Sequence, residues 1–178
     1  MPLEQTVRNA HMSLLQLRDA LVDVRLTVVE DKPQAGDLVL VDVLGDRLDA
    51  LQGWVEQALA AADGARLAAV QPANLNQLQR WLVTCQEQYH VYLQHFTVDL
   101  ASYERITELN RAARRGGEWR AWAQSVRKGI DETQHHTTAV GQALFVCWQE
   151  VGERIGGTSI SVTASSVGQS VVQPGQEV

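Results

Sequence analysis

Two stretches of the chain each carry a glutamate and a histidine three positions apart, a spacing that can bind metal. The pairs are Glu87 with His90 and Glu132 with His135. In ferritin-like four-helix bundles, such a pair on each of two helices helps to hold two metal ions. The apolar pattern that includes Leu75 places Glu87 and His90 away from the core, and solvated faces are the simpler reading for both pairs. We therefore predict no metal and no cofactor.

Asp99 is the one charged residue on an otherwise apolar stripe. If the chain folds back on itself at Gly116 and Gly117, Asp99 lies opposite Thr133, and His95 and His136 are one turn away. Because an unpaired carboxylate in a core is costly, we predict a hydrogen-bonded polar layer that fixes the register of the helices. Metal binding or acid–base chemistry at this layer is the alternative.

Residues 105–128 concentrate almost half of the positive charge of the chain. This stretch has seven basic and two acidic residues, whereas the whole chain has a net charge of −6. Arginine beside tryptophan suits phosphate, anionic lipid or an acidic protein surface. We predict an interaction site here, with an ordinary solvated helix end as the alternative. The predicted residues are Arg105, Arg111, Arg114, Arg115, Arg120, Arg127, Lys128 and Trp122.

The C-terminal tail, residues 158–178, differs in composition from the rest of the chain. It is rich in Ser, Thr and Val and carries no charge before Glu177. We predict that it is not helical, and that it is either disordered or pairs as a strand with another chain. The predicted pairing residues are Ile160, Val162, Val167 and Val171. A helical bundle followed by such a tail resembles, in layout, bacterial cell-death modules with C-terminal signalling amyloids.

Four long amphipathic helices must position these residues. Apolar side chains recur at alternating spacings of three and four, which is the pattern of a helix packed along one seam. The segments are residues 3–31, 37–63, 71–115 and 117–155, separated by prolines and glycines. The run LVLVDVL at 38–44 also has strand propensity, but the stripe continues through it and favours helix. Seam residues of the last two segments include Leu78, Leu82, Cys85, Tyr89, Tyr92, Phe96, Tyr103 and Ile106, and Trp119, Val126, Ile130, Thr137, Leu144, Cys147 and Val151.

Short connections make consecutive helices antiparallel neighbours. We therefore predict an all-α fold, an antiparallel up-down-up-down four-helix bundle over residues 1–157, followed by the tail. The third and fourth segments are the longest, so the hairpin around 105–128 is expected to project beyond the bundle. Cys85 and Cys147 would face each other at one level as buried free thiols.

Composition narrows the function classes. Hydrophobic residues make up 45%, enough for a core, and two cysteines exclude a disulfide-rich scaffold. The sequence has no secretory leader pattern and no apolar run of membrane-spanning length, so we expect a cytoplasmic protein without a transmembrane segment. The acidic balance argues against specific nucleic-acid binding. Phosphate-loop, dinucleotide-binding and nucleophile-elbow motifs are absent, so we expect no enzyme.

The leading hypothesis is a non-enzymatic helical interaction module, a scaffold or adaptor. It would form a homo-oligomer or bind a larger protein partner through the basic hairpin tip and the tail. Its first 70 residues hold 11 acidic and 6 basic residues, which could meet the basic tip of another copy. One alternative is an effector of the cell-death type that engages a membrane, another anionic surface or a phosphate ligand. The second alternative is an enzyme or metal protein that uses Asp99, His95 and His136.

Overall fold

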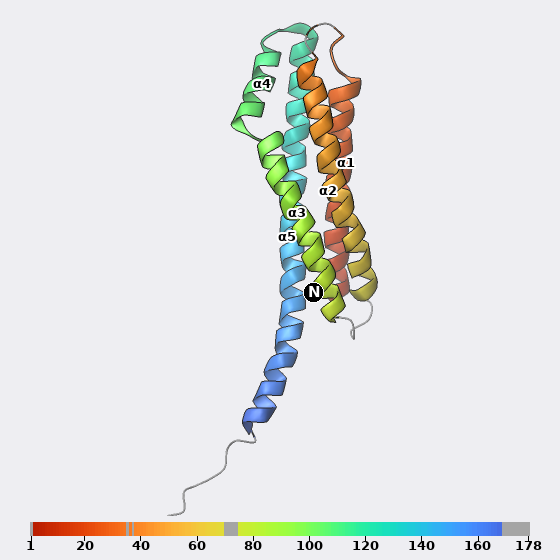
Figure 1. Cartoon of the computed structure of the whole chain (residues 1–178), viewed down its shortest axis with the longest axis vertical. Helices are drawn as coiled ribbons and strands as arrows, with labels where there is room; N and C mark the ends of the chain where they lie inside the picture. Colours follow the sequence, from red (N-terminus) through yellow and green to blue (C-terminus); the bar gives the residue numbers. More distant parts are fainter. Residues whose placement is uncertain (1, 35, 37, 70–74, 169–178) are drawn as a thin grey trace, which may run out of the picture.

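All of the regular secondary structure in the part of the chain that the structure describes is helical. The computed structural model describes residues 2–34, 36, 38–69 and 75–168. Five helices follow one another there: α1 (Leu3–Glu30), α2 (Val39–Ala69), α3 (Leu75–Asp99), α4 (Tyr103–Ala113) and α5 (Gly117–Gly168). The four long helices lie side by side, and α4 packs beside the first part of α5 (Figure 1). The all-α prediction is confirmed for these residues, and the strand-prone run at 38–44 lies almost entirely in α2.

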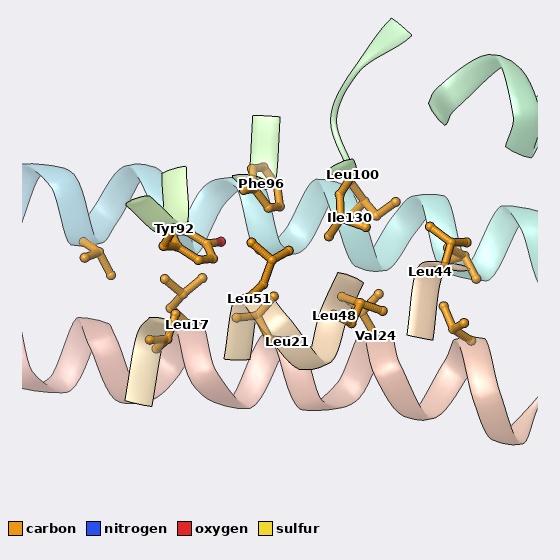
Figure 2. Packing of buried hydrophobic residues seen from close by; sticks show 14 of the residues in the cluster. Leu17, Leu21, Val24, Leu44, Leu48, Leu51, Tyr92, Phe96, Leu100 and Ile130 are labelled. Atoms are coloured by element: carbon orange, nitrogen blue, oxygen red, sulfur yellow. The ribbon is translucent and has the colours of Figure 1, made fainter. Parts of the chain in front are cut away.

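The core is built from the predicted apolar stripes. Tyr92 and Phe96 of α3 lie over Leu17 of α1 and Leu51 of α2 in the centre of the bundle (Figure 2). The stripes supply most of the buried side chains, including Leu14, Leu21, Val24, Val28, Leu44, Leu48, Val55, Leu78, Leu82, Val126, Ile130, Val140, Leu144 and Val151. The helices therefore pack through the faces that the spacing predicts.

Two ion pairs show which parts of α1 and α2 lie side by side. His11 of α1 pairs with Asp63 of α2 at 2.8 Å, and Arg25 pairs with Asp49. In both pairs an early residue of one helix meets a late residue of the other. Cys85 and Cys147 are buried and free, as predicted.

The third segment is not one continuous helix, contrary to the prediction. It breaks after Asp99, and α4 begins at Tyr103, with the Ser102 hydroxyl accepting a hydrogen bond from the backbone N–H of Arg105 at 3.2 Å. Serine is among the best residues for this capping role, because its oxygen satisfies an N–H that has no partner within the helix. The break also shifts the buried face. Tyr103, a predicted seam residue, is 88% exposed, whereas Leu109 is buried.

The basic hairpin does not project beyond the bundle, which corrects a second expectation. Because α3 ends early, α4 and the start of α5 lie at the same end as the α1–α2 connection (Figure 1). The indole N–H of Trp122 donates to the backbone carbonyl of Val28 at 3.2 Å. Gly36 has a φ of +115° and packs against the Trp119 ring. The tryptophans thus hold the hairpin to the α1–α2 corner.

The predicted non-helical tail is wrong for residues 158–168, which continue α5 across the expected domain boundary at 157. Ile160, Val162 and Val167 therefore lie within a helix, and Val171 lies outside the described residues. Gly156 and Gly157 weaken a helix by about 1 kcal/mol each, yet extending an existing helix avoids the cost of nucleation. The end of α5 extends away from the bundle (Figure 1). Over the described residues, no helix combines the length and apolarity needed to cross a membrane.

Substituting alanine for each of two helical glycines is expected to change the stability of the chain in opposite directions. A methyl group on Gly129 would lie 2.7 Å from Val24 Cγ2, whereas one on Gly53 has nothing within 4 Å. Gly53→Ala is expected to raise the free energy of unfolding by about 0.5–1 kcal/mol, because alanine is the better helix former. Gly129→Ala is expected to lower it by about 1–2 kcal/mol through overpacking between α1 and α5. Urea denaturation measures both, and a gain for Gly129→Ala would contradict the close approach of these helices.

Candidate interaction surface at the α4–α5 corner

Six exposed basic side chains lie between the last turn of α4 and the first turns of α5. We call this surface the basic corner, and it consists of Arg111, Arg114, Arg115, Arg120, Arg127 and Lys128. Among the described residues, the one ion pair of this set joins Lys128 to Glu132 at 3.9 Å, and Arg127 donates to the neutral side chain of Asn110 at 2.8 Å. Within the described residues, Arg111, Arg114 and Arg120 form no ion pair. The basic residues of the predicted cluster, apart from Arg105, are therefore on the surface.

Arg105 has a different role from the other predicted arginines. It is half-buried, its Nε donates to the backbone carbonyl of Asp99 at 2.8 Å, and its Nη1 pairs with Glu108 at 2.6 Å. These bonds tie the first turn of α4 to the end of α3. Arg105 thus supports the corner and is already partly neutralised.

Trp122 does not form part of an exposed interaction surface, contrary to the prediction. Its side chain is only 2% exposed, because it packs in the core and bonds to Val28. Trp119 is buried as well and meets Trp122 edge-on, with ring centroids 5.5 Å apart. The Arg115 guanidinium lies over the Trp119 ring at 4.9 Å. One arginine, Arg115, thus stacks on Trp119, and both tryptophan side chains are buried.

The predicted polar layer has a different composition in the structure. Asp99 is paired with His95 of its own helix at 3.4 Å and lies 3.9 Å from Arg47 of α2. Thr133 is buried but donates to the carbonyl of Gly129 in its own helix. Because α3 ends at Asp99, its carboxylate reaches the α2 side and the partly exposed His95.

His136 is half-buried. The polar bonds between α3 and α5 come instead from two tyrosines. The Tyr92 hydroxyl lies 2.7 Å from Thr137 Oγ1, and the Tyr89 hydroxyl donates to the Thr137 carbonyl at 2.8 Å. Burial raises the pKa of both tyrosines, so they stay neutral donors near neutral pH. The seam positions of these tyrosines and of Thr137 were readable from the sequence, but not which polar pair would meet.

The metal-type pairs lie on exposed faces. Glu87, His90, Glu132 and His135 are all exposed. Among the described residues, no group of three His, Cys, Asp or Glu side chains could hold a metal ion. These four residues are best explained as solvated polar positions of helices.

A groove beside the basic corner was missed by sequence reasoning. It holds about 230 Å³ and is lined from α2 by Val39, Leu40 and Val43. No sequence signal connects these three apolar residues to the arginines, because the two sets are distant in the chain and come together only where α2 and α4 line the same groove. Comparisons with protein-family models, with curated proteins and with solved structures found no match for this chain.

Proposed function

We propose that this chain is a non-enzymatic helical binding module that docks an acidic surface of a partner protein on its basic corner. The single observation behind this proposal is the placement of six exposed cations on one corner of a chain with net charge −6. Such a local reversal of sign steers an anionic partner to one place and orients it. Arginine adds bidentate recognition of carboxylates.

The helical bundle would serve as a rigid support for the basic corner. We take α1, α2, α3 and α5 as an up-down-up-down antiparallel bundle, with α4 as a short fifth helix over one end. Buried tryptophans anchor the corner to this bundle, so the arginines are presented on fixed helices. Fixed helices lose less conformational entropy on binding than a mobile loop would. A second copy of the chain is one source of an acidic surface, since residues 1–70 hold 11 acidic and 6 basic residues.

The proposal is tested by reversing charge at the corner. The triple variant Arg114→Glu, Arg120→Glu and Arg127→Glu is expected to weaken binding to poly-L-glutamate at low salt by more than about tenfold, because attraction is replaced by repulsion. The melting temperature should change little, since exposed charges contribute little to stability. Sedimentation velocity on the same samples reports self-association.

A matched control separates local charge from net charge. Arg8→Glu, Arg18→Glu and Arg80→Glu change the net charge equally, but these residues lie away from the corner. This control should keep poly-L-glutamate binding within about twofold of the native chain. Equal losses in both triple variants would refute the corner as the binding surface. A loss confined to phosphatidylserine vesicles, with poly-L-glutamate binding unchanged, would replace the protein partner with a membrane.

A further inference from the structure

The groove beside the basic corner combines an apolar side with a cationic rim. One face of α4 supplies Arg105, Glu108, Arg111 and Ala112 at helical spacings of three and four, and Arg115 continues this face beyond the end of the helix. The first turns of α2 contribute Val39, Leu40 and Val43, and Trp119 of α5 completes the lining. An apolar strip thus runs directly beside several guanidinium groups.

The apolar side of the groove is exposed. Val39 is 63% exposed, and Leu40 and Val43 are partly buried. A side chain of a ligand placed against these residues would remove apolar surface from water on both partners. The groove can therefore favour a ligand with an apolar side chain, which we call the anchor, as well as a negative charge.

The rim of the groove carries a net positive charge. Three arginines face one carboxylate, Glu108, and that carboxylate is already bonded to Arg105. Arg111 makes no ion pair with any described residue, and Arg115 presents its face to the Trp119 ring. A guanidinium stacked on an aromatic ring keeps its N–H edge for a carboxylate. Two rim cations are thus placed to receive acidic groups on either side of an anchor.

The dimensions of the groove distinguish between classes of ligand. At about 230 Å³ it is smaller than the cavities of about 300–1,000 Å³ that enclose drug-sized molecules. It suits one or two side chains of a peptide. A flat bilayer surface would meet the arginine rim without filling the hollow between α2 and α4.

We propose that this groove binds a short acidic segment of the partner protein through one apolar anchor, with carboxylates flanking the anchor on Arg111 and Arg115. This inference rests on the proposed function and adds the kind of sequence that the partner presents. The apolar anchor contributes selectivity, and the flanking carboxylates contribute attraction.

Two labelled nonapeptides test the inference by fluorescence anisotropy with the full chain. Each has four glutamates on either side of a central residue, which is leucine in one peptide and serine in the other. The native chain is expected to bind the leucine peptide about tenfold more tightly, because only leucine gains from burial in the groove. Val39→Ser should remove most of this preference while leaving the affinity for the serine peptide unchanged. Arg111→Glu should weaken both peptides.

A matched control is available on α3. Val98 is 68% exposed and lies outside the groove, so Val98→Ser should keep the full preference for leucine. Equal affinities of the native chain for the two peptides, with charge-dependent binding to poly-L-glutamate retained, would overturn the groove while the proposed function stands. Failure to bind either peptide or poly-L-glutamate would overturn both. A preference for leucine that survives Val39→Ser would also overturn this groove as the anchor site.

Discussion

Truncation of Phe96 to alanine is expected to lower the free energy of unfolding by about 3–5 kcal/mol, a large share of the about 5–15 kcal/mol typical of a domain. Phe96 is completely buried and stacks against Tyr92, with ring centroids 5.8 Å apart. It lies where α1, α2, α3 and α5 meet (Figure 2). Its removal loses the free energy gained when the ring was transferred out of water. It also leaves a cavity, which lowers the stability further. Urea denaturation followed by circular dichroism measures the change.

Phe145 provides the matched control, because it is the other phenylalanine of the chain and is 58% exposed on α5. Phe145→Ala should change the free energy of unfolding by less than about 1 kcal/mol, since little of its apolar surface is buried there. Similar losses at both positions would contradict the packing of α3 into the bundle. The comparison requires only that the Phe96→Ala protein still folds, so that its free energy of unfolding can be measured.

The apolar stripes could be predicted from the sequence because burial follows helical spacing over many turns. From Leu78 to Phe96 every predicted seam residue is buried, and Val140, Leu144 and Cys147 repeat this on α5. A seam of this length tolerates few alternative faces. The fold class and the four long segments follow from such stripes.

The break between α3 and α4 could not be predicted from the stripe alone. Tyr103 and Ile106 continue the heptad in sequence, but the chain bends at Ser102 and buries Leu109 in place of Tyr103. Ser102 is a capping residue, and its signal was overridden by the apolar spacing on both sides of it. Two local bonds of Arg105, to the backbone carbonyl of Asp99 and to the Glu108 carboxylate, stabilise this break.

The candidate site was predicted by charge but not by shape. The sequence places Arg111, Arg114 and Arg115 in one cluster, whatever the details of the fold. Whether Trp122 faces water or the core depends on how the hairpin meets α1, and its bond to Val28 spans 94 positions. The groove depends equally on a distant partner, since Val39 belongs to α2. Long-range packing of this kind leaves no mark in local spacing.

Alkaline pH is expected to destabilise the chain because the two buried thiols resist ionisation in the folded state. Burial, with a smaller contribution from neighbouring Cys147, raises the pKa of Cys85 from 9.0 to about 12. Burial also raises the pKa of Cys147 from 9.0 to about 11. Above about pH 9 the unfolded chain therefore binds fewer protons than the folded one. The contribution of the two thiols to the free energy of unfolding is fully present below that pH, and it falls as the pH rises toward their folded-state pKa values. Between pH 8 and pH 10 the loss should be about 2–3 kcal/mol for the two thiols together.

The variant Cys85→Ala with Cys147→Ala isolates this effect, because the slope against pH and not the absolute stability is the readout. The double variant should be less stable at pH 7, since it loses buried volume, but its stability should fall much less between pH 8 and pH 10. Tyr89 and Tyr92, whose pKa values burial also raises from 10.0, add a smaller loss as the pH approaches 10, and this loss is the same in both proteins. Urea titrations at fixed ionic strength give the two slopes. Equal slopes in the native chain and the double variant would show that neither thiol is buried as a neutral group, and would contradict the packing of α3 against α5 at this level.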